Sequence, residues 1–203
     1  MTTATGPARR MRAPARRAQL IDVTARLAVE EGFHAVSVEA IAQRAGVTRA
    51  VIYQHFPDLH ALLESVIDRE MTLAQAQVAH TTPTDLGTGQ AKELLLHNLA
   101  AFLTAVRENP MTWRLVLLPP EGAPALLRER IQHGRSMVLG QLTRAVRRGL
   151  RVEEFGDAEL TAHLLSAIAD EYARLVLTDP ERYPPDRLLQ HADRWLDRDA
   201  FGL

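Results

Sequence analysis

One segment, Ser37–Phe56, constrains the fold of this chain more than any other part of the sequence. It contains two short helical patterns that meet at Gly46, a residue that can take a left-handed backbone conformation and so permits a tight turn. Ala42 provides the small side chain that lets two helices approach closely, and Ile52 provides a buried aliphatic residue in the second helix. The segment therefore predicts a helix-turn-helix, which makes a nucleic acid the first partner to consider.

Helix start and stop signals support this interpretation. Ser37 and Thr48 each precede one of the two patterns, where a hydroxyl can accept a hydrogen bond from an otherwise unpaired backbone N–H. Upstream, apolar residues recur at helical spacing over residues 16–31, and this pattern stops at Gly32. Asp58 is placed to cap a fourth helix that reaches to about residue 79.

The rest of the chain continues in helical patterns. Pro110 and Pro124 occupy positions suited to the first turn of a helix, and Asp157 is placed to cap a later helix. Residues 80–89 have no periodicity and are expected to form a loop. An all-α fold of about nine helices without strands is predicted, its later helices covering residues 91–107, 110–118, 124–149, 157–178 and 184 onward.

Charge is distributed unevenly along the 203 residues, although the net charge is only -1. Residues 1–56 hold eight Arg against four acids, a balance of +4, whereas the remainder is acidic. Residues 1–15 are expected to form a disordered basic arm, which either follows DNA or is a solvated tail. The chain has no cysteine and no apolar run long enough for a membrane span. Its first residues include arginines but no apolar h-region, so we expect no signal peptide. We therefore expect a cytoplasmic protein with no membrane partner.

Two longer strings surround the turn and carry a family resemblance. They read EEGFHAVSVEAIA and YQHFPDLHALLESVI. With these strings, residues 16–68 resemble the DNA-binding domain of TetR/AcrR-type transcriptional regulators. The resemblance implies an all-helical homodimer that usually releases DNA when it binds a small molecule. It also implies a helix-turn-helix domain over residues 16–57 and a helical effector-binding and dimerisation domain over residues 58–203.

The second helix of the motif is expected to read the major groove with its N-terminal residues. Arg49 suits guanine, Ala50 suits a thymine methyl group, and Gln54 suits adenine or a phosphate. The resemblance implies backbone contacts for Tyr53 and His55, and we expect phosphate contacts from the first helix of the motif. The predicted DNA-binding residues are Ser37, Arg44, Thr48, Arg49, Ala50, Tyr53, Gln54 and His55.

Small residues recur at steps of four, three and four on the helix predicted over residues 157–178. Such a face suits close packing, either in a symmetric four-helix dimer interface or within one chain. The residues expected at a dimer interface are Ala162, Leu165, Ser166, Ala169, Ala173, Val176, Leu188, Ala192 and Trp195.

A small-molecule effector is expected from the family resemblance and from the apolar composition of the C-terminal body. A pocket between helices would be mainly apolar with a few polar groups. The candidate pocket residues, for which plain core packing is the alternative, are His97, Phe102, Met111, Trp113, Arg114, Met137 and Tyr172.

An enzyme is the main alternative class. His163 is followed by Asp170 and Glu171, and His191 by Asp193, but no His-x-x-x-His pair, phosphate loop or nucleophile elbow occurs. We therefore expect no catalysis, no metal and no cofactor. The predicted function is a repressor released from DNA by a mostly apolar ligand, and the alternative is a ligand-independent DNA-binding regulator or an activator.

Overall fold

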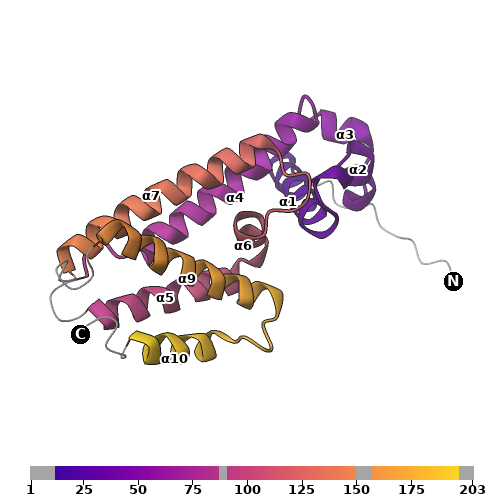
Figure 1. Cartoon of the computed structure of the whole chain (residues 1–203). Helices are drawn as coiled ribbons and strands as arrows, with labels where there is room; N and C mark the ends of the chain where they lie inside the picture. Colours follow the sequence, from indigo (N-terminus) through magenta and orange to yellow (C-terminus); the bar gives the residue numbers. More distant parts are fainter. Residues whose placement is uncertain (1–11, 87–90, 150–156, 197–203) are drawn as a thin grey trace. The chain divides into compact units, whose positions relative to one another are not determined.

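The computed structural model describes residues 12–86, 91–149 and 157–196, and every regular element within these ranges is a helix (Figure 1). This confirms the predicted all-α class. Within the described residues there are nine α-helices and one short 3-10 helix, η1. Their bounds are α1 Ala13–Glu31, η1 Phe33–Ala35, α2 Val38–Ala45, α3 Arg49–Tyr53, α4 Leu59–Thr81, α5 Ala91–Glu108, α6 Pro110–Leu117, α7 Ala125–Gly149, α9 Ala158–Thr178 and α10 Pro185–Leu196.

The chain divides into two compact units, and the division falls within α4 between Val66 and Ile67. The sequence predicts a boundary after Pro57, nine residues earlier, and packing at the start of α4 explains the difference. Leu62 and Val66, in the first two turns of α4, are fully buried, and Ser65 accepts a hydrogen bond from Arg17 of α1 at 2.9 Å. The start of α4 therefore belongs to the packing of the first unit.

The first unit is built on α1, which packs against η1 and α2. Its core contains Leu20, Leu27 and Ile41, each at most 1% exposed. α1 begins at Ala13, three residues before its predicted start, with Pro14 in its first turn where a missing N–H does no harm. Of the predicted arm, residues 1–11 lie outside the described residues and residues 13–15 are helical.

The second unit is a bundle in which α9 packs along α7 and α5, and α5 in turn packs against α10 (Figure 1). α6 packs against α5 and α9. Leu103, Val106 and Leu127, each at most 1% exposed, are among its core residues. No helix within the described ranges combines the length and the apolar character needed to cross a membrane.

The predicted capping residues fix where two of the longer helices begin. Asp157 accepts hydrogen bonds from the backbone N–H groups of Glu159 at 2.8 Å and Leu160 at 3.2 Å, so it caps α9. Asp58 accepts one from Ala61 at 2.8 Å at the start of α4. The capping predictions at these two positions are confirmed, because each carboxylate pairs backbone donors that a helix leaves unsatisfied.

Candidate functional site

The turn between α2 and α3 has the geometry that its sequence predicts. The Ser37 hydroxyl accepts a hydrogen bond from the Ala40 N–H at 3.1 Å and caps α2. Gly46 ends α2 with φ of 63°, in the left-handed region that L side chains rarely adopt. The Val47 N–H then donates to the Ala42 carbonyl at 3.0 Å. These bonds fix the direction in which α3 leaves the turn.

One face of α3 packs against the core of the first unit, and the other face is exposed. Ile52 is 1% exposed, as predicted, and Phe56 just beyond α3 is 2% exposed, so both belong to the core. Thr48 occupies the capping position of α3 without a capping bond from its side chain. The predicted DNA-binding residues of this segment are exposed except for the half-buried His55; the exposed set is Thr48, Arg49, Ala50, Tyr53 and Gln54. Such a face can enter a major groove without unfolding the unit.

Two of the predicted DNA contacts are arginines that already pair with acids. Arg49 meets Glu39 of α2 at 2.9 Å, in an ion pair where both side chains are exposed. Arg44 meets Glu30 at 2.7 Å and also pairs with Glu31. The hydrogen bond to Glu30 and the charge of Glu31 raise the pKa of Arg44. A phosphate or a base that binds either guanidinium therefore competes with an internal carboxylate for its N–H donors.

A cavity of about 490 Å³ lies in the second unit, between side chains of α4, α5, α6, α7, α9 and α10. One side of α5 shows how it is built, since Leu95, Asn98, Leu99 and Phe102 recur at helical spacing and all line it. The volume falls within the range of about 300–1,000 Å³ that small-molecule sites occupy. Most of the lining side chains are apolar, so the cavity suits a ligand with a large apolar part.

Three of the seven predicted pocket residues line this cavity, namely Phe102, Trp113 and Met137. The rings of Phe102 and Trp113 meet edge to face, with centroids 4.9 Å apart. The Trp113 indole N–H donates to Gln77 Oε1 at 2.8 Å, which satisfies its polar atom and fixes the ring. Met137 is 59% exposed and therefore also reaches solvent.

The other four predicted pocket residues lie elsewhere. His97 is exposed, because it lies on α5 between the lining positions Leu95 and Asn98 but points to another side of the helix. Arg114 donates to the Leu177 carbonyl, and Tyr172 shares a hydrogen bond of 2.6 Å with His191. The lining does not include Arg114, Tyr172 or the half-buried Met111.

The residues predicted for a dimer interface either lie in the core of the second unit or line its cavity. Ala162, Ala173, Val176 and Leu188 are buried core residues, each at most 5% exposed. The remaining five line the cavity: Leu165, Ser166, Ala169, Ala192 and Trp195. The small residues of α9 thus make room for neighbouring helices and for the cavity within one chain. A homodimer and the residues that form its interface remain predictions.

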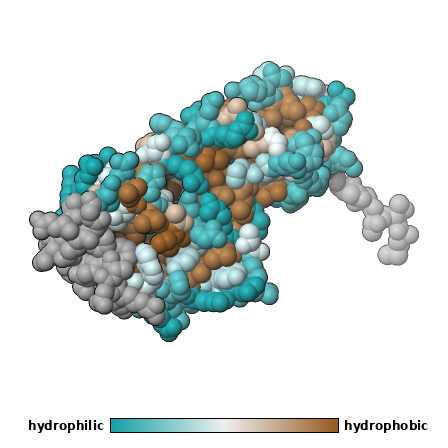
Figure 2. Space-filling model, viewed as in Figure 1, coloured by the Kyte–Doolittle hydropathy of each residue, from teal (hydrophilic) through white to brown (hydrophobic). Residues whose placement is uncertain are grey.

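Exposed leucines occupy a different face of α9. Leu160 is 62% exposed and Leu164 is 65% exposed, and a spacing of four residues places them on one side of the helix. Figure 2, in the orientation of Figure 1, shows apolar side chains at the surface of the second unit in the region of α7 and α9.

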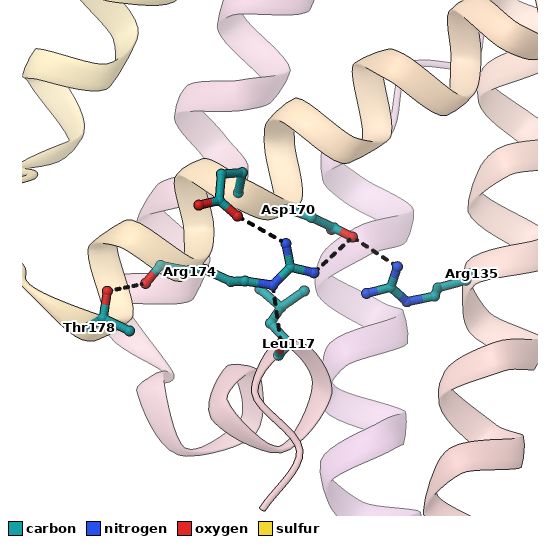
Figure 3. A network of polar contacts seen from close by, with 6 residues as sticks. Leu117, Arg135, Asp170, Arg174 and Thr178 are labelled. Atoms are coloured by element: carbon teal, nitrogen blue, oxygen red, sulfur yellow. Dashed lines mark hydrogen bonds and ion pairs between the residues drawn. The ribbon is translucent and has the colours of Figure 1, made fainter.

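The cavity wall also carries charge, which the sequence analysis missed. Arg135 of α7 meets Asp170 of α9 with Nη1 at 3.1 Å from Oδ2, and Arg174 approaches the same oxygen at 4.0 Å (Figure 3). Burial raises the pKa of Asp170, although the charges of Arg135 and Arg174 act to lower it. A sequence signal exists, since Arg135 lies between Ile131 and Val138 on the apolar side of α7.

Comparison with known proteins identifies relatives of the first unit. Residues 20–66 match the family model described as bacterial regulatory proteins, tetR family. The HTH-type transcriptional activator FasR of Mycolicibacterium smegmatis is 30% identical over 101 residues, which are 50% of this chain and 45% of FasR. The HTH-type transcriptional repressor KstR of the same organism is 30% identical over 96 residues, which are 47% of this chain and 46% of KstR. The chain thus spans about half the length of these curated relatives.

A comparison of structures extends the likeness to the whole fold. The transcriptional regulator FadR from Bacillus subtilis, solved in complex with stearoyl-CoA, has a TM-score of 0.62 and 19% identity. The match covers 88% of this chain and 96% of FadR. At this identity the comparison shows a shared fold, which includes the helical second unit.

Proposed function

We propose that this chain, whose residues 20–66 match the family model of tetR-type bacterial regulatory proteins, is a sequence-specific DNA-binding transcriptional repressor released by a small, mostly apolar ligand. The observation that carries the proposal is the exposed outer face of α3 on a buried anchor, Ile52. The apolar cavity of the second unit supports the ligand. A regulator of this kind works where bacterial DNA lies, which is the cytoplasm.

We assign two kinds of DNA contact to the first unit, one to base edges and one to phosphates. Arg49, Ala50 and Gln54 are exposed where a recognition helix meets base edges. Tyr53 and Arg44 are placed for phosphate contacts, which fix the register and make binding depend on salt. Ser37 already caps α2, so its hydroxyl is the weaker candidate for a phosphate contact.

One copy of α3, Arg49–Tyr53, offers few side chains to a duplex. Two copies related by a twofold axis read half-sites about 34 Å apart, or a multiple of that distance. We therefore propose that the protein binds its operator as a homodimer.

Ligand control requires the cavity to be linked energetically to DNA binding. A ligand that binds the DNA-free conformation more tightly than the DNA-bound conformation weakens DNA binding by the ratio of its two affinities. A coupling of about 1–3 kcal/mol changes DNA affinity about 5- to 150-fold. The relatives' names support both directions of regulation, because KstR is a repressor and FasR an activator. Activation is therefore the second candidate.

The test is a gel-shift screen of the DNA upstream of the encoding gene, over a salt series. We expect a discrete complex that persists in excess random duplex. Its affinity should fall steeply as the salt concentration rises. A library of apolar metabolites is then added at fixed salt. If random duplex displaces the protein as well as the upstream fragment does, sequence-specific DNA binding is contradicted. If the complex is specific but no metabolite weakens it, the ligand-independent regulator is favoured.

A further inference from the structure

The charged residues of the cavity wall are almost all basic. Among the residues that line it, the ionisable ones are Arg130, Arg135, Arg144 and Asp170, and none is Lys, Glu or His. Three positive side chains therefore face one negative side chain around an otherwise neutral lining. A wall with this excess of positive charge favours an anionic group over a cationic one.

The three arginines differ in how they are engaged. Arg130 pairs with Asp68 at 3.2 Å. Arg144 is exposed and makes no ion pair with the residues that the structure describes. Arg135 is half-buried and pairs with Asp170, so it is the arginine held deepest in the wall.

The geometry of the Arg135–Asp170 pair favours replacement of Asp170 by another anion as the partner of Arg135. Arg135 meets Asp170 through a single nitrogen, whereas a guanidinium presents five N–H donors that fit a carboxylate or phosphate with two parallel bonds. Asp170 is only 19% exposed, and burial raises its pKa, so its ionised form is poorly solvated. An incoming anion can satisfy the unused donors of Arg135 better than Asp170 does.

Resting on the proposed function, we propose that the ligand is an anionic amphiphile whose carboxylate or phosphate head binds Arg135 in place of Asp170, while its apolar chain fills the cavity. The exchange has a structural consequence. The Arg135–Asp170 pair joins α7 to α9, whereas Arg174 is also held by the Leu117 carbonyl at 3.3 Å and by Glu171 at 3.2 Å (Figure 3). Ligand binding therefore releases α9 from α7 at this point and leaves the contact of α9 with α6 in place.

The test measures binding to the full chain without DNA. Four probes share a twelve-carbon chain and differ in the head: dodecanoate, dodecyl phosphate, dodecanol and dodecylammonium. Each ionic probe is used below its micelle concentration and dodecanol below its solubility limit. Quenching or a spectral shift of tryptophan fluorescence reports binding, since Trp113 and Trp195 both line the cavity. We expect both anions to bind at least about tenfold more tightly than dodecanol, and dodecylammonium to bind most weakly.

Variants then test the assignment to Arg135. Arg135→Gln should remove most of the preference for anions and change dodecanol affinity by less than about twofold. Asp170→Asn should tighten anion binding severalfold, a gain that a misfolded protein does not show. Arg147→Gln is the matched control, since Arg147 is an exposed arginine of α7 outside the lining.

Four results overturn the inference: no preference for the anions, tightest binding of dodecylammonium, an unchanged preference in Arg135→Gln, or no binding of any of the four probes. These outcomes are independent of the proposed function, because DNA binding is measured separately by the gel shift. A chain that binds its operator but not the anions loses only this inference.

Discussion

Arg49 lies at the start of α3 and is the residue on which sequence-specific binding should depend most. Its side chain is exposed and within 2.9 Å of Glu39. If Arg49 binds guanine, Arg49→Ala should lower operator affinity by about 1–3 kcal/mol and relax the preference at one base pair. Fluorescence anisotropy on the operator and on a random duplex measures both effects. An equal loss on the two duplexes assigns Arg49 to a phosphate instead, and Arg147→Ala in the second unit is the control for lost charge.

Glu39 places a negative charge beside α3, and its expected role follows from its ion pair with Arg49. The carboxylate holds the Arg49 guanidinium while repelling nearby phosphates. Glu39→Gln should therefore tighten binding to random duplex about threefold and lower the ratio of specific to random affinity, because Arg49 is no longer guided. Glu64→Gln is the matched control, since Glu64 is an exposed acid of the first unit paired with His60. An unchanged affinity ratio would mean that the pair of Arg49 and Glu39 is only a solvated surface contact.

At the scale of the helix, glycines within α7 differ in what surrounds them. A Cβ added at Gly134 meets no atom within 4 Å, whereas one added at Gly149 lies 2.8 Å from backbone atoms of Leu86. Gly134→Ala should stabilise the protein by about 0.5–1 kcal/mol, because alanine loses less backbone entropy in a helix interior. Gly149→Ala should destabilise it, because the buried Leu86 must move. Urea denaturation of both variants tests the contrast, and a loss of stability in Gly134→Ala would show that the space at Gly134 is needed.

The helices themselves were predictable because their limits are set locally. Asp157 caps α9, Gly46 ends α2 and Pro110 begins α6, each through a backbone requirement that a short sequence reveals. The exposed face of α3 follows in the same way from the buried Ile52. The cavity is different, because the meeting of several helices decides which side of each one lines it. His97 and Asn98 are neighbours on α5, yet only Asn98 faces the cavity. Composition alone does not separate them.

At the scale of the whole molecule, the proposed homodimer needs a surface that joins its two copies, because a twofold operator is read by two copies of α3. The small residues of α9 are used within the chain, which leaves Leu160 and Leu164 as exposed apolar side chains of that helix. Exposed leucines on one helix face are typical of surfaces that a partner covers. We expect that face of α9 to contribute to the homodimer.

Leu164→Glu tests this expectation, because a carboxylate that would be buried between two copies loses its hydration without gaining a partner. The dimer dissociation constant should rise about ten- to a hundredfold, and operator affinity should fall with it. Analytical ultracentrifugation over a concentration series measures the first effect and anisotropy the second. Leu73→Glu is the control, since Leu73 is a leucine of α4 that is 38% exposed. If Leu164→Glu leaves the dimer intact while the protein stays folded, another surface joins the two copies.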